Sequence, residues 1–508
     1  MESYRKGVVS SSFFNLLAQL LSFVTSIAFA YYFGAQAKTD VYYYCLSILS
    51  LMAGFIISLD SSVLIPEAMS IAEKSGREES VRFLNFFLYL FLIISVGLTL
   101  VMAFLPMSFF MTLSRFDPAL LRAHASIVAW SIPLFGLQII SQYLVDILNS
   151  YKYFSLPLVL GIINRAVILI CLVGFHRSLD VLSILIGSVV AFLLQIIMTV
   201  RIMKTKLHWD FKAHWLIIEK RVRTNIFFSQ IGNLASTLSA YVPIFLLSAF
   251  SAGIITALNY GQRITSIPTL IITIQVSTVI GIKLNEMCAK QDWLGVDQAF
   301  VRAARMLLFI LLPLSAFLFV YANELVEMLL QRGAFDPDSV GKTALFFRWF
   351  ILVIPFVAIN TLFARLFMAT RKIVLGAWFQ IIANSLLIIL TIIGLKALGA
   401  VGYPIALVGF YVLEIGGLFW IFQFFFPFVH YGVVLQDLLK MLIFNSVLAL
   451  VVWYWRIAMQ PFGTVISLAT GAAVFAGLFV GANLLFPLNR EINRDCLDFL
   501  KQRGFYRS

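Results

Sequence analysis

Residues 83–105 read FLNFFLYLFLIISVGLTLVMAFL, a stretch that contains no charged side chain. An α-helix rises about 1.5 Å per residue, so a helix of this length crosses the hydrocarbon core of a bilayer, which is about 30 Å thick. Similar apolar runs recur along the whole chain, whereas the strands of a membrane barrel alternate over segments of about 10 residues. The sequence therefore predicts an all-α, polytopic membrane protein.

The composition excludes a water-soluble fold. Of the 508 residues, 61% are hydrophobic and 12% are charged, whereas soluble domains are about half apolar and about one quarter charged. The first apolar run is too long for a signal-peptide core and lacks a small-residue cleavage site, so we expect it to remain as a span. Apolar runs bounded by charged or turn residues predict fourteen spans, near residues 8–33, 40–66, 83–105, 123–147, 155–176, 181–200, 226–250, 255–283, 306–330, 345–370, 374–396, 400–424, 438–456 and 463–487.

Lysine and arginine residues are distributed unevenly between the two sides of these spans. With the N terminus in the cytoplasm, 25 of them fall in cytoplasmic segments and eight on the opposite side. Positively charged loops are retained in the cytoplasm, and an even number of spans puts both termini on one side. We therefore expect a multi-pass protein of the bacterial inner membrane with both termini in the cytoplasm.

The longest predicted cytoplasmic loop is basic and divides the chain. Trp209 and Trp215 lie among its lysine and arginine residues, which is typical of a segment at the lipid headgroup surface. Two parallel six-helix halves are a common transporter architecture. The expected organisation is an N-terminal lobe of helices 1–6 (1–200), the basic loop (201–225), a C-terminal lobe of helices 7–12 (226–424), helices 13 and 14 (425–487), and a cytoplasmic tail (488–508).

Residues that bind metals or nucleotides do not form the patterns that those functions need. The four cysteines and five histidines are dispersed, without a metal-ligand or redox spacing. Gly341-Lys342-Thr343 resembles the end of a phosphate-binding loop, but Asp336 stands where that motif needs a glycine. The net charge of +13 comes from short loops between spans, which indicates membrane orientation rather than nucleic-acid binding. We therefore expect no metal, no cofactor, no ATP, no nucleic acid and no enzymatic site.

Four charged residues lie deep within predicted spans: Arg165, Arg263, Asp60 and Glu414. A charge at the bilayer centre costs several kcal/mol, so such residues are functional candidates. One interpretation is that an arginine pairs with a carboxylate and ties two helices together. The other is that an arginine faces a water-filled cavity and binds an anionic headgroup, because a guanidinium group matches the geometry of phosphate.

A stripe of polar residues follows helix 1, where Asn15, Gln19, Ser22 and Ser26 recur at helical spacing. Such a stripe either faces a cavity or serves as packing between helices, since serine and asparagine often join membrane helices.

Several segments in order along the chain carry a resemblance to one transporter family. They are Gly34-Ala35 with Thr39-Asp40; Ile147-Leu148-Asn149-Ser150 with Phe154, Pro157 and Asn164; Ser251-Ala252-Gly253 with Ala257-Leu258, Tyr260, Arg263 and Pro268; Arg332-Gly333-Ala334-Phe335-Asp336; and Asn384 with Gly399, Gly402 and Ala406. The chain resembles the MurJ (MviN) family, the lipid II flippases within the multidrug/oligosaccharidyl-lipid/polysaccharide exporter superfamily. The resemblance covers nearly the whole chain, and the fourteen-helix count matches.

The resemblance implies two six-helix lobes that form a V around a central cavity, with helices 13 and 14 shaping a groove for a polyprenyl tail. It implies that an undecaprenyl-linked glycan crosses by alternating access, and that membrane lipid and enzymes of envelope synthesis are partners. The expected substrate-binding residues are Arg263, Arg165, Gln19, Thr25, Ser22, Asp40 and Asp60, and the expected gating or coupling residues are Glu414 and Asn384.

The chain departs from the family where charge matters for the substrate. The family has cavity arginines on helices 1 and 2, where this chain has Gln19, Thr25 and Met52-Ala53, and helix 7 carries no carboxylate for the sodium site of some relatives. Lipid II is the leading expected substrate. The alternatives are an exopolysaccharide or O-antigen precursor, a drug/cation antiporter of the same superfamily, and a scaffold that does not transport.

Overall fold

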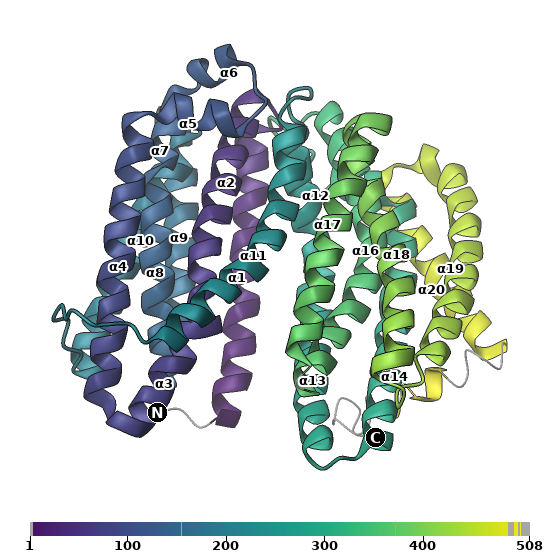
Figure 1. The fold of residues 1–508 in the computed structure, drawn as a ribbon. Helices are drawn as coiled ribbons and strands as arrows, with labels where there is room; N and C mark the ends of the chain where they lie inside the picture. The colour runs from purple at the N-terminus through teal and green to yellow at the C-terminus, as the bar shows by residue number, and fades with distance from the viewer. Residues whose placement is uncertain (1–3, 154, 371, 486–491, 496–497, 499–508) are drawn as a thin grey trace. The chain divides into compact units, whose positions relative to one another are not determined.

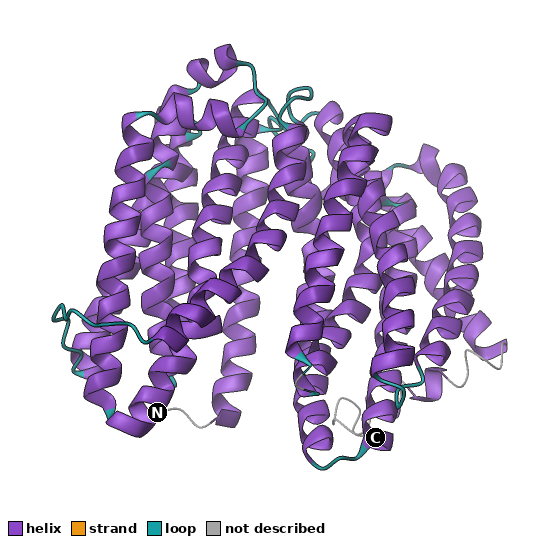
Figure 2. Cartoon of the chain, viewed as in Figure 1, coloured by secondary structure: helices purple, strands orange, loops and turns teal. Residues whose placement is uncertain are grey.

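The structure is a computed structural model that describes residues 4–153, 155–370, 372–485, 492–495 and 498. Every regular element in these residues is a helix (Figures 1 and 2), which confirms the all-α class. Thirteen helical stretches of the described chain are long and apolar enough to cross a membrane, and one of them, Val374–Phe425, covers two predicted spans, 374–396 and 400–424. Counted this way, the described residues carry the fourteen expected spans.

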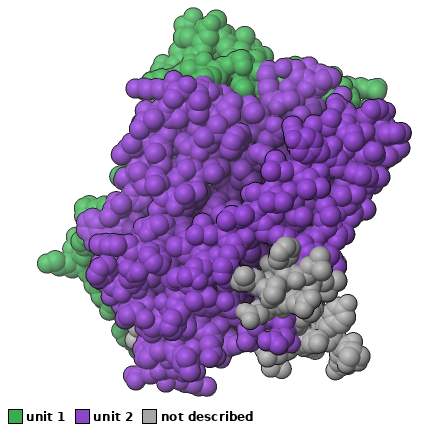
Figure 3. All heavy atoms as spheres, turned by 90° about the vertical axis from the view of Figure 1, so that its right-hand side faces the viewer, with its two compact units in different colours: residues 1–256, 332–335 green, residues 257–331, 336–508 purple. Residues whose placement is uncertain are grey.

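The helices group into two compact units, which Figure 3 shows in different colours. Unit 1 comprises residues 1–256 and 332–335, and unit 2 comprises residues 257–331 and 336–508. The seventh long helix, α11 (Lys220–Leu247), belongs to unit 1, where it packs along α2 (Ala37–Leu59). The compact units thus divide the chain later than the basic loop 201–225, and the expected lobe boundaries stay a prediction.

Unit 1 is a bundle in which α9 packs against α1 and α10, while α8 packs against α2, α4 and α10. A pronounced turn at Gly34, with φ of +62°, separates α1 from α2. Besides α2 and α11, the helices of the unit are α1 (Tyr4–Phe33), η1 (Asp60–Leu64), α3 (Ile65–Ser75), α4 (Arg77–Phe104), α5 (Pro106–Leu113), α6 (Pro118–Ala123), α7 (Ala125–Ser131), α8 (Pro133–Ser150), α9 (Ser155–Leu179) and α10 (Leu182–Leu207).

Unit 2 is a bundle built around α14 and α16, which pack against each other and against α13, α18 and α19. Helices α17 and α18 form a hairpin in which Gly394 and Gly402 allow close approach of the two backbones. The elements are α12 (Ile254–Pro268), η2 (Thr269–Thr273), α13 (Ile274–Ala289), α14 (Trp293–Val320), α15 (Ala322–Leu330), α16 (Pro337–Ala369), α17 (Ile373–Leu398), η3 (Gly399–Val401), α18 (Gly402–Phe425), α19 (Tyr431–Met459), η4 (Gln460–Phe462) and α20 (Thr464–Leu485). The first three residues of α12 belong to unit 1.

Several of the predicted spans are not single helices, and the ninth and the second are examples. The ninth, expected at 306–330, is α14, which already begins at Trp293, followed by the separate helix α15. The start of α14 contains Arg302 and Arg305, so an apolar-run rule cuts it off even though it is helical. The second, expected at 40–66, continues through a π-helical turn, η1, into α3.

Candidate functional site

Gln19, Ser22 and Thr25 lie on α1 in unit 1. Gln19 and Ser22 are partly exposed, whereas Thr25 is buried and its hydroxyl donates to the Leu21 carbonyl at 2.8 Å. A hydroxyl bonded to its own helix is less able to bind a ligand. Helix α9, which carries the partly exposed Arg165, packs against α1. The structure therefore places Arg165 on the helix that neighbours Gln19 and Ser22.

Asp40 lies in the first turn of α2 and is 3% exposed. Its carboxylate accepts hydrogen bonds from the backbone N–H of Gly253 at 2.6 Å and of Thr256 at 2.8 Å, and from the Thr256 hydroxyl at 2.6 Å. These donors lie at the start of α12, where unpaired N–H groups and the helix dipole favour a negative charge. Asp40 is thus held by protein donors, and its observed contact is the cap of α12.

Gly253 can donate to Asp40 in this position because it has no side chain. Its φ is +86°, and a Cβ added there would lie 2.6 Å from the Ala35 carbonyl oxygen. Any side chain would therefore be strained in the backbone and would clash with Ala35.

Asp60 lies at the other end of α2, in the π-helical turn η1. The twenty residues between Asp40 and Asp60 correspond to about 30 Å along a helix, so the two carboxylates do not share a site. Asp60 is 0% exposed and neither carboxyl oxygen has a hydrogen-bond partner in the described residues. No ion pair in the described chain joins Asp60 or Glu414 to an arginine, so the interpretation that these charges tie helices together is not supported.

A row of polar contacts, which was not predicted from the sequence, joins α11 to the C-terminal end of α2 and to η1. Asn233 donates to the Ser58 hydroxyl at 2.8 Å, the Ser62 and Ser229 hydroxyls are 2.8 Å apart, and Gln230 donates to the Phe55 carbonyl at 3.1 Å. Helix α11 is the least hydrophobic of the long spans. That low hydropathy was the available signal for a helix that pairs through polar side chains.

Arg263 lies on α12, within the span Ile254–Ala289 as predicted, and its side chain is exposed. On the same helix, Gln262, Thr265 and Ser266 line a cavity of about 270 Å³ that α16 and α18 also bound. The guanidinium group is therefore accessible, beside a strip of polar side chains.

Glu414 and Asn384, the expected coupling pair, line one cavity of about 500 Å³ between α16, α17 and α18. Glu414 is buried, and its Oε1 accepts a hydrogen bond from Asn360 at 2.9 Å. The Asn384 side chain donates to the Gln380 carbonyl at 2.8 Å. The structure brings these two residues together, and Asn360 and Gln380 join them as further polar groups of the same cavity.

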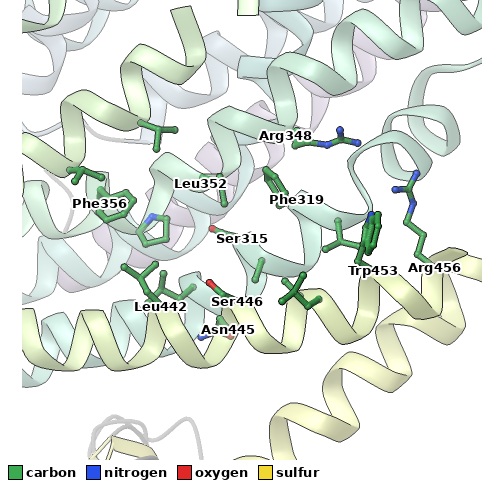
Figure 4. Close-up of a pocket in the computed structure, with 18 residues that line it drawn as sticks. Ser315, Phe319, Arg348, Leu352, Phe356, Leu442, Asn445, Ser446, Trp453 and Arg456 are labelled. Carbon is green, nitrogen blue, oxygen red and sulfur yellow. The ribbon is translucent and has the colours of Figure 1, made fainter. Parts of the chain in front are cut away.

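A cavity of unit 2 with a volume of about 800 Å³ lies between α14, α16, α18 and α19 (Figure 4). Arg348, Trp453 and Arg456 gather at one end, while Phe356 and Leu442 line the other. Most of the wall is apolar. The cavity is therefore amphipathic, with an apolar channel that ends at two guanidinium groups.

The two arginines differ in their partners. Arg456 pairs with Glu324, whereas Arg348 donates to the Asn323 side chain at 3.4 Å and lies 5.9 Å from the Phe319 ring. Two arginines and one carboxylate leave this end of the cavity with a net positive charge. The cavity could not be predicted from the sequence, because its residues come from four helices that lie far apart in the chain.

Helix α19, which forms one wall of this cavity, is fixed by ion pairs near both of its ends. Asp437 accepts a hydrogen bond from Arg305 of α14 at 2.6 Å, and Arg456 pairs with Glu324 of α15.

No group of His, Cys, Asp and Glu residues in the described chain is able to hold a metal ion.

Solved structures place this fold among membrane transporters. A solved structure of a lipid II flippase MurJ in an inward closed conformation matches 94% of this chain and 100% of its own, with a TM-score of 0.77 and 19% identity. An inward-facing multidrug resistance MATE family transporter of the MOP superfamily matches 79% of this chain and 93% of its own, with a TM-score of 0.60 and 14% identity. The fold is thus one that these solved transporters share.

Sequence comparisons define the family within that class. The family model described as lipid II flippase MurJ matches residues 29–473. A probable lipid II flippase MurJ of Borreliella burgdorferi is 24% identical over 410 residues, 77% of each chain, and one of Rickettsia prowazekii is 24% identical over 427 residues, 80% of this chain and 82% of its own. The chain belongs to the lipid II flippase MurJ family.

Proposed function

We propose that this chain is a flippase that moves lipid II, a peptidoglycan precursor linked to undecaprenyl pyrophosphate, from the inner to the outer leaflet of the bacterial inner membrane. The match of the lipid II flippase model to residues 29–473 carries the proposal, because it extends over nearly all of the helices of both units. The amphipathic cavity of unit 2 supports it, since the substrate joins an apolar chain to an anionic headgroup. The protein acts by alternating access and is not an enzyme.

The cavity of unit 2 suits part of the prenyl tail. Along α19, Arg456 is fourteen positions after Leu442, a rise of about 21 Å, and along α16 Phe356 is eight positions after Arg348, a rise of about 12 Å. Burial of apolar surface there stabilises a chain by about 25 cal/mol per Å². The tail lies in this channel, whose positively charged end is made by Arg348 and Arg456.

Each unit, taken by itself, presents accessible side chains that suit an anionic headgroup. Arg165 and Arg263 supply positive charge, and Gln19 and Ser22 supply hydrogen bonds. Thr25 contributes to packing, because its hydroxyl is used within α1. A guanidinium group binds a phosphate with two parallel hydrogen bonds, which fixes the headgroup in orientation as well as position.

Asp40 controls the start of α12, the helix in which the chain leaves unit 1. Its three accepted hydrogen bonds hold this junction. Charge-assisted bonds contribute about 1.5–3 kcal/mol each, so release of this cap is a step that substrate binding has to offset. Glu414 and Asn384 act in coupling, from their shared cavity in unit 2.

One observation favours a second candidate substrate, an exopolysaccharide or O-antigen precursor on the same lipid carrier. Gln19 and Thr25 are uncharged where the family has arginines, so the first helix offers less attraction to a pyrophosphate. A lipid II substrate then depends more strongly on Arg165.

Complementation of a lipid II flippase depletion tests the proposal. The wild type should restore growth, and Ser446→Trp should not, because a tryptophan in place of this cavity-lining serine blocks the apolar channel. Arg165→Ala should also fail, since it removes the deeply placed cation of the first helices.

Val447→Trp is the matched control, because Val447 is the adjacent residue of α19, is 56% exposed and does not line the cavity. It should support growth at the same abundance as the wild type. If the wild type is well expressed and still does not complement, lipid II is the wrong substrate, and the other lipid-linked glycans become the leading candidates.

A further inference from the structure

Asp60 differs from the other buried carboxylates of the described chain. Each of the others accepts at least one hydrogen bond, whereas both carboxyl oxygens of Asp60 lack a partner and the residue is 0% exposed. The buried carboxylates with partners are Asp40, Asp297, Glu414 and Asp437. An orphan carboxyl group in a packed bundle therefore needs its own explanation.

The groups around Asp60 do not stabilise a negative charge. Helix α8 presents Asp146 and Tyr143, which interact electrostatically with Asp60. The Tyr143 hydroxyl donates to the Leu84 carbonyl at 2.9 Å, so its proton is already used, and Asp146 is a like charge.

The other elements that pack against η1 are α2, α3 and α11. None of their titratable groups forms an ion pair or hydrogen bond with Asp60 in the described chain. Those groups are Lys38, Asp40, Tyr42, Tyr43, Tyr44 and Cys45 on α2; Glu67, Glu73 and Lys74 on α3; and Lys220, Arg221, Arg223 and Tyr241 on α11.

A neutral carboxylic acid resolves this arrangement. An ionised carboxylate that is buried without donors costs several kcal/mol, and a second carboxylate nearby adds to that cost. A protonated acid needs only an acceptor for its O–H, and a carbonyl of the π-helical turn that lacks a helical donor can serve as one. The Ile65 N–H bonds to the Asp60 carbonyl, five residues back, and Pro66 has no N–H to donate to the preceding turn.

The position of Asp146 supplies a route for the proton. Asp146 is half-buried, and it accepts a hydrogen bond at 3.0 Å from Gln142, which is exposed. Asp146 is therefore partly accessible to solvent, whereas Asp60 is fully buried. A proton reaches Asp60 from water by way of Asp146 and leaves by the same path, with no other bond made or broken.

We propose that Asp60 is a proton-binding site in unit 1, that Asp146 exchanges its proton with water, and that this proton is coupled to transport. The coupling rests on the proposed function, whereas the proton site does not. It also gives this chain a source of energy that is independent of a carboxylate on α11, where the sequence has none.

Infrared spectroscopy of the full-length protein in liposomes tests the site directly. The carbonyl band of a protonated carboxylic acid should be present in the wild type at neutral pH, absent from Asp60→Asn, and lost as the pH rises. In Asp146→Asn the band should be lost at a lower pH than in the wild type, because removal of the negative charge of Asp146 makes ionisation of Asp60 easier. Spectra of the wild type and Asp60→Asn that agree at every pH would overturn the proposal.

A growth assay tests the coupling. Asp60→Asn is permanently neutral, so it should reach wild-type abundance but fail to complement the flippase depletion, whereas Ser61→Ala, on the same helical turn, should complement. Wild-type growth of Asp60→Asn would show that the proton is not used in transport. A wild type that shows the titrating band but does not complement would refute the proposed substrate and leave the proton site in place.

Discussion

Arg263 is exposed on α12, beside the polar residues Gln262 and Ser266. An exposed cation in a membrane bundle is well placed to meet an anionic headgroup. At this scale the chemistry of one side chain decides the expected result.

We expect Arg263→Ala to reduce complementation at least tenfold at normal abundance, which corresponds to the loss of about 1.4 kcal/mol or more of binding. Arg263→Lys should recover only part of the activity, because an ammonium keeps the charge but cannot form the two parallel bonds of a guanidinium group. Growth against expression level in a depletion strain measures both. Equal activity of the alanine and lysine variants would contradict a role in binding phosphate.

The residues that the sequence analysis could identify were those whose chemistry is unusual for their place. Asp60 and Glu414 stood out because carboxylates are rare within apolar runs, and both prove to be buried. The surroundings of the two could not be inferred, since Asn360, which donates to Glu414, and Tyr143, which lies near Asp60 without bonding to it, come from other helices. Arg348 was missed for a related reason, because it lies near the end of a span, where an arginine usually reaches water.

Among the elements, α16 has a start that can be tested by itself. Asp336 precedes the helix, and its side chain accepts a hydrogen bond from the Ser339 N–H at 2.8 Å. The hydrogen bonds from Ser339 hold the pKa of Asp336 below its usual value. Because this pKa is lowered, the cap contributes its full stability at pH values above about 4, the ordinary pKa of an aspartate. The contribution is lost as the pH falls through the lowered pKa.

Asp336→Ala should therefore destabilise the protein by about 0.5–2 kcal/mol at neutral pH, and by less in acid. Thermal unfolding in detergent at several pH values measures the difference. Asp338→Ala is the matched control, because Asp338 is exposed and makes only a surface ion pair with Lys342, worth about 0–1 kcal/mol. An equal loss for both variants, or one that does not change with pH, would argue against the cap.

Long elements were predictable from hydropathy, and irregular ones were not. Each long apolar run became a helix because a buried backbone has to bond internally in lipid. The π-helical turns Asp60–Leu64 and Thr269–Thr273 had no such signal, although Pro66 and Pro268 lie beside them. A proline only shows that one hydrogen bond is missing, and neighbouring helices decide how the chain compensates.

For the whole molecule, the uneven distribution of lysine and arginine leads to a prediction about orientation. A cysteine in place of Asp338 should react with a membrane-impermeant thiol reagent in intact spheroplasts, whereas one in place of Lys212 should not. Both positions are exposed, so access to the reagent differs only by the side of the membrane. Labelling is measured after the native cysteines are replaced, and the opposite pattern would reverse the topology.

The four residues Arg332–Phe335 belong to unit 1, although the chain on both sides of them belongs to unit 2. The Ala334 N–H donates to the Tyr31 carbonyl at 2.8 Å, and Gly333 packs against Tyr31. A ribosome delivers residues in order, so the end of α1 stays without this partner until α15 has been synthesised and inserted. Biogenesis of the first unit is consequently finished only after five later helical elements have entered the membrane, and a gene cut at the basic loop encodes no fragment that contains it whole.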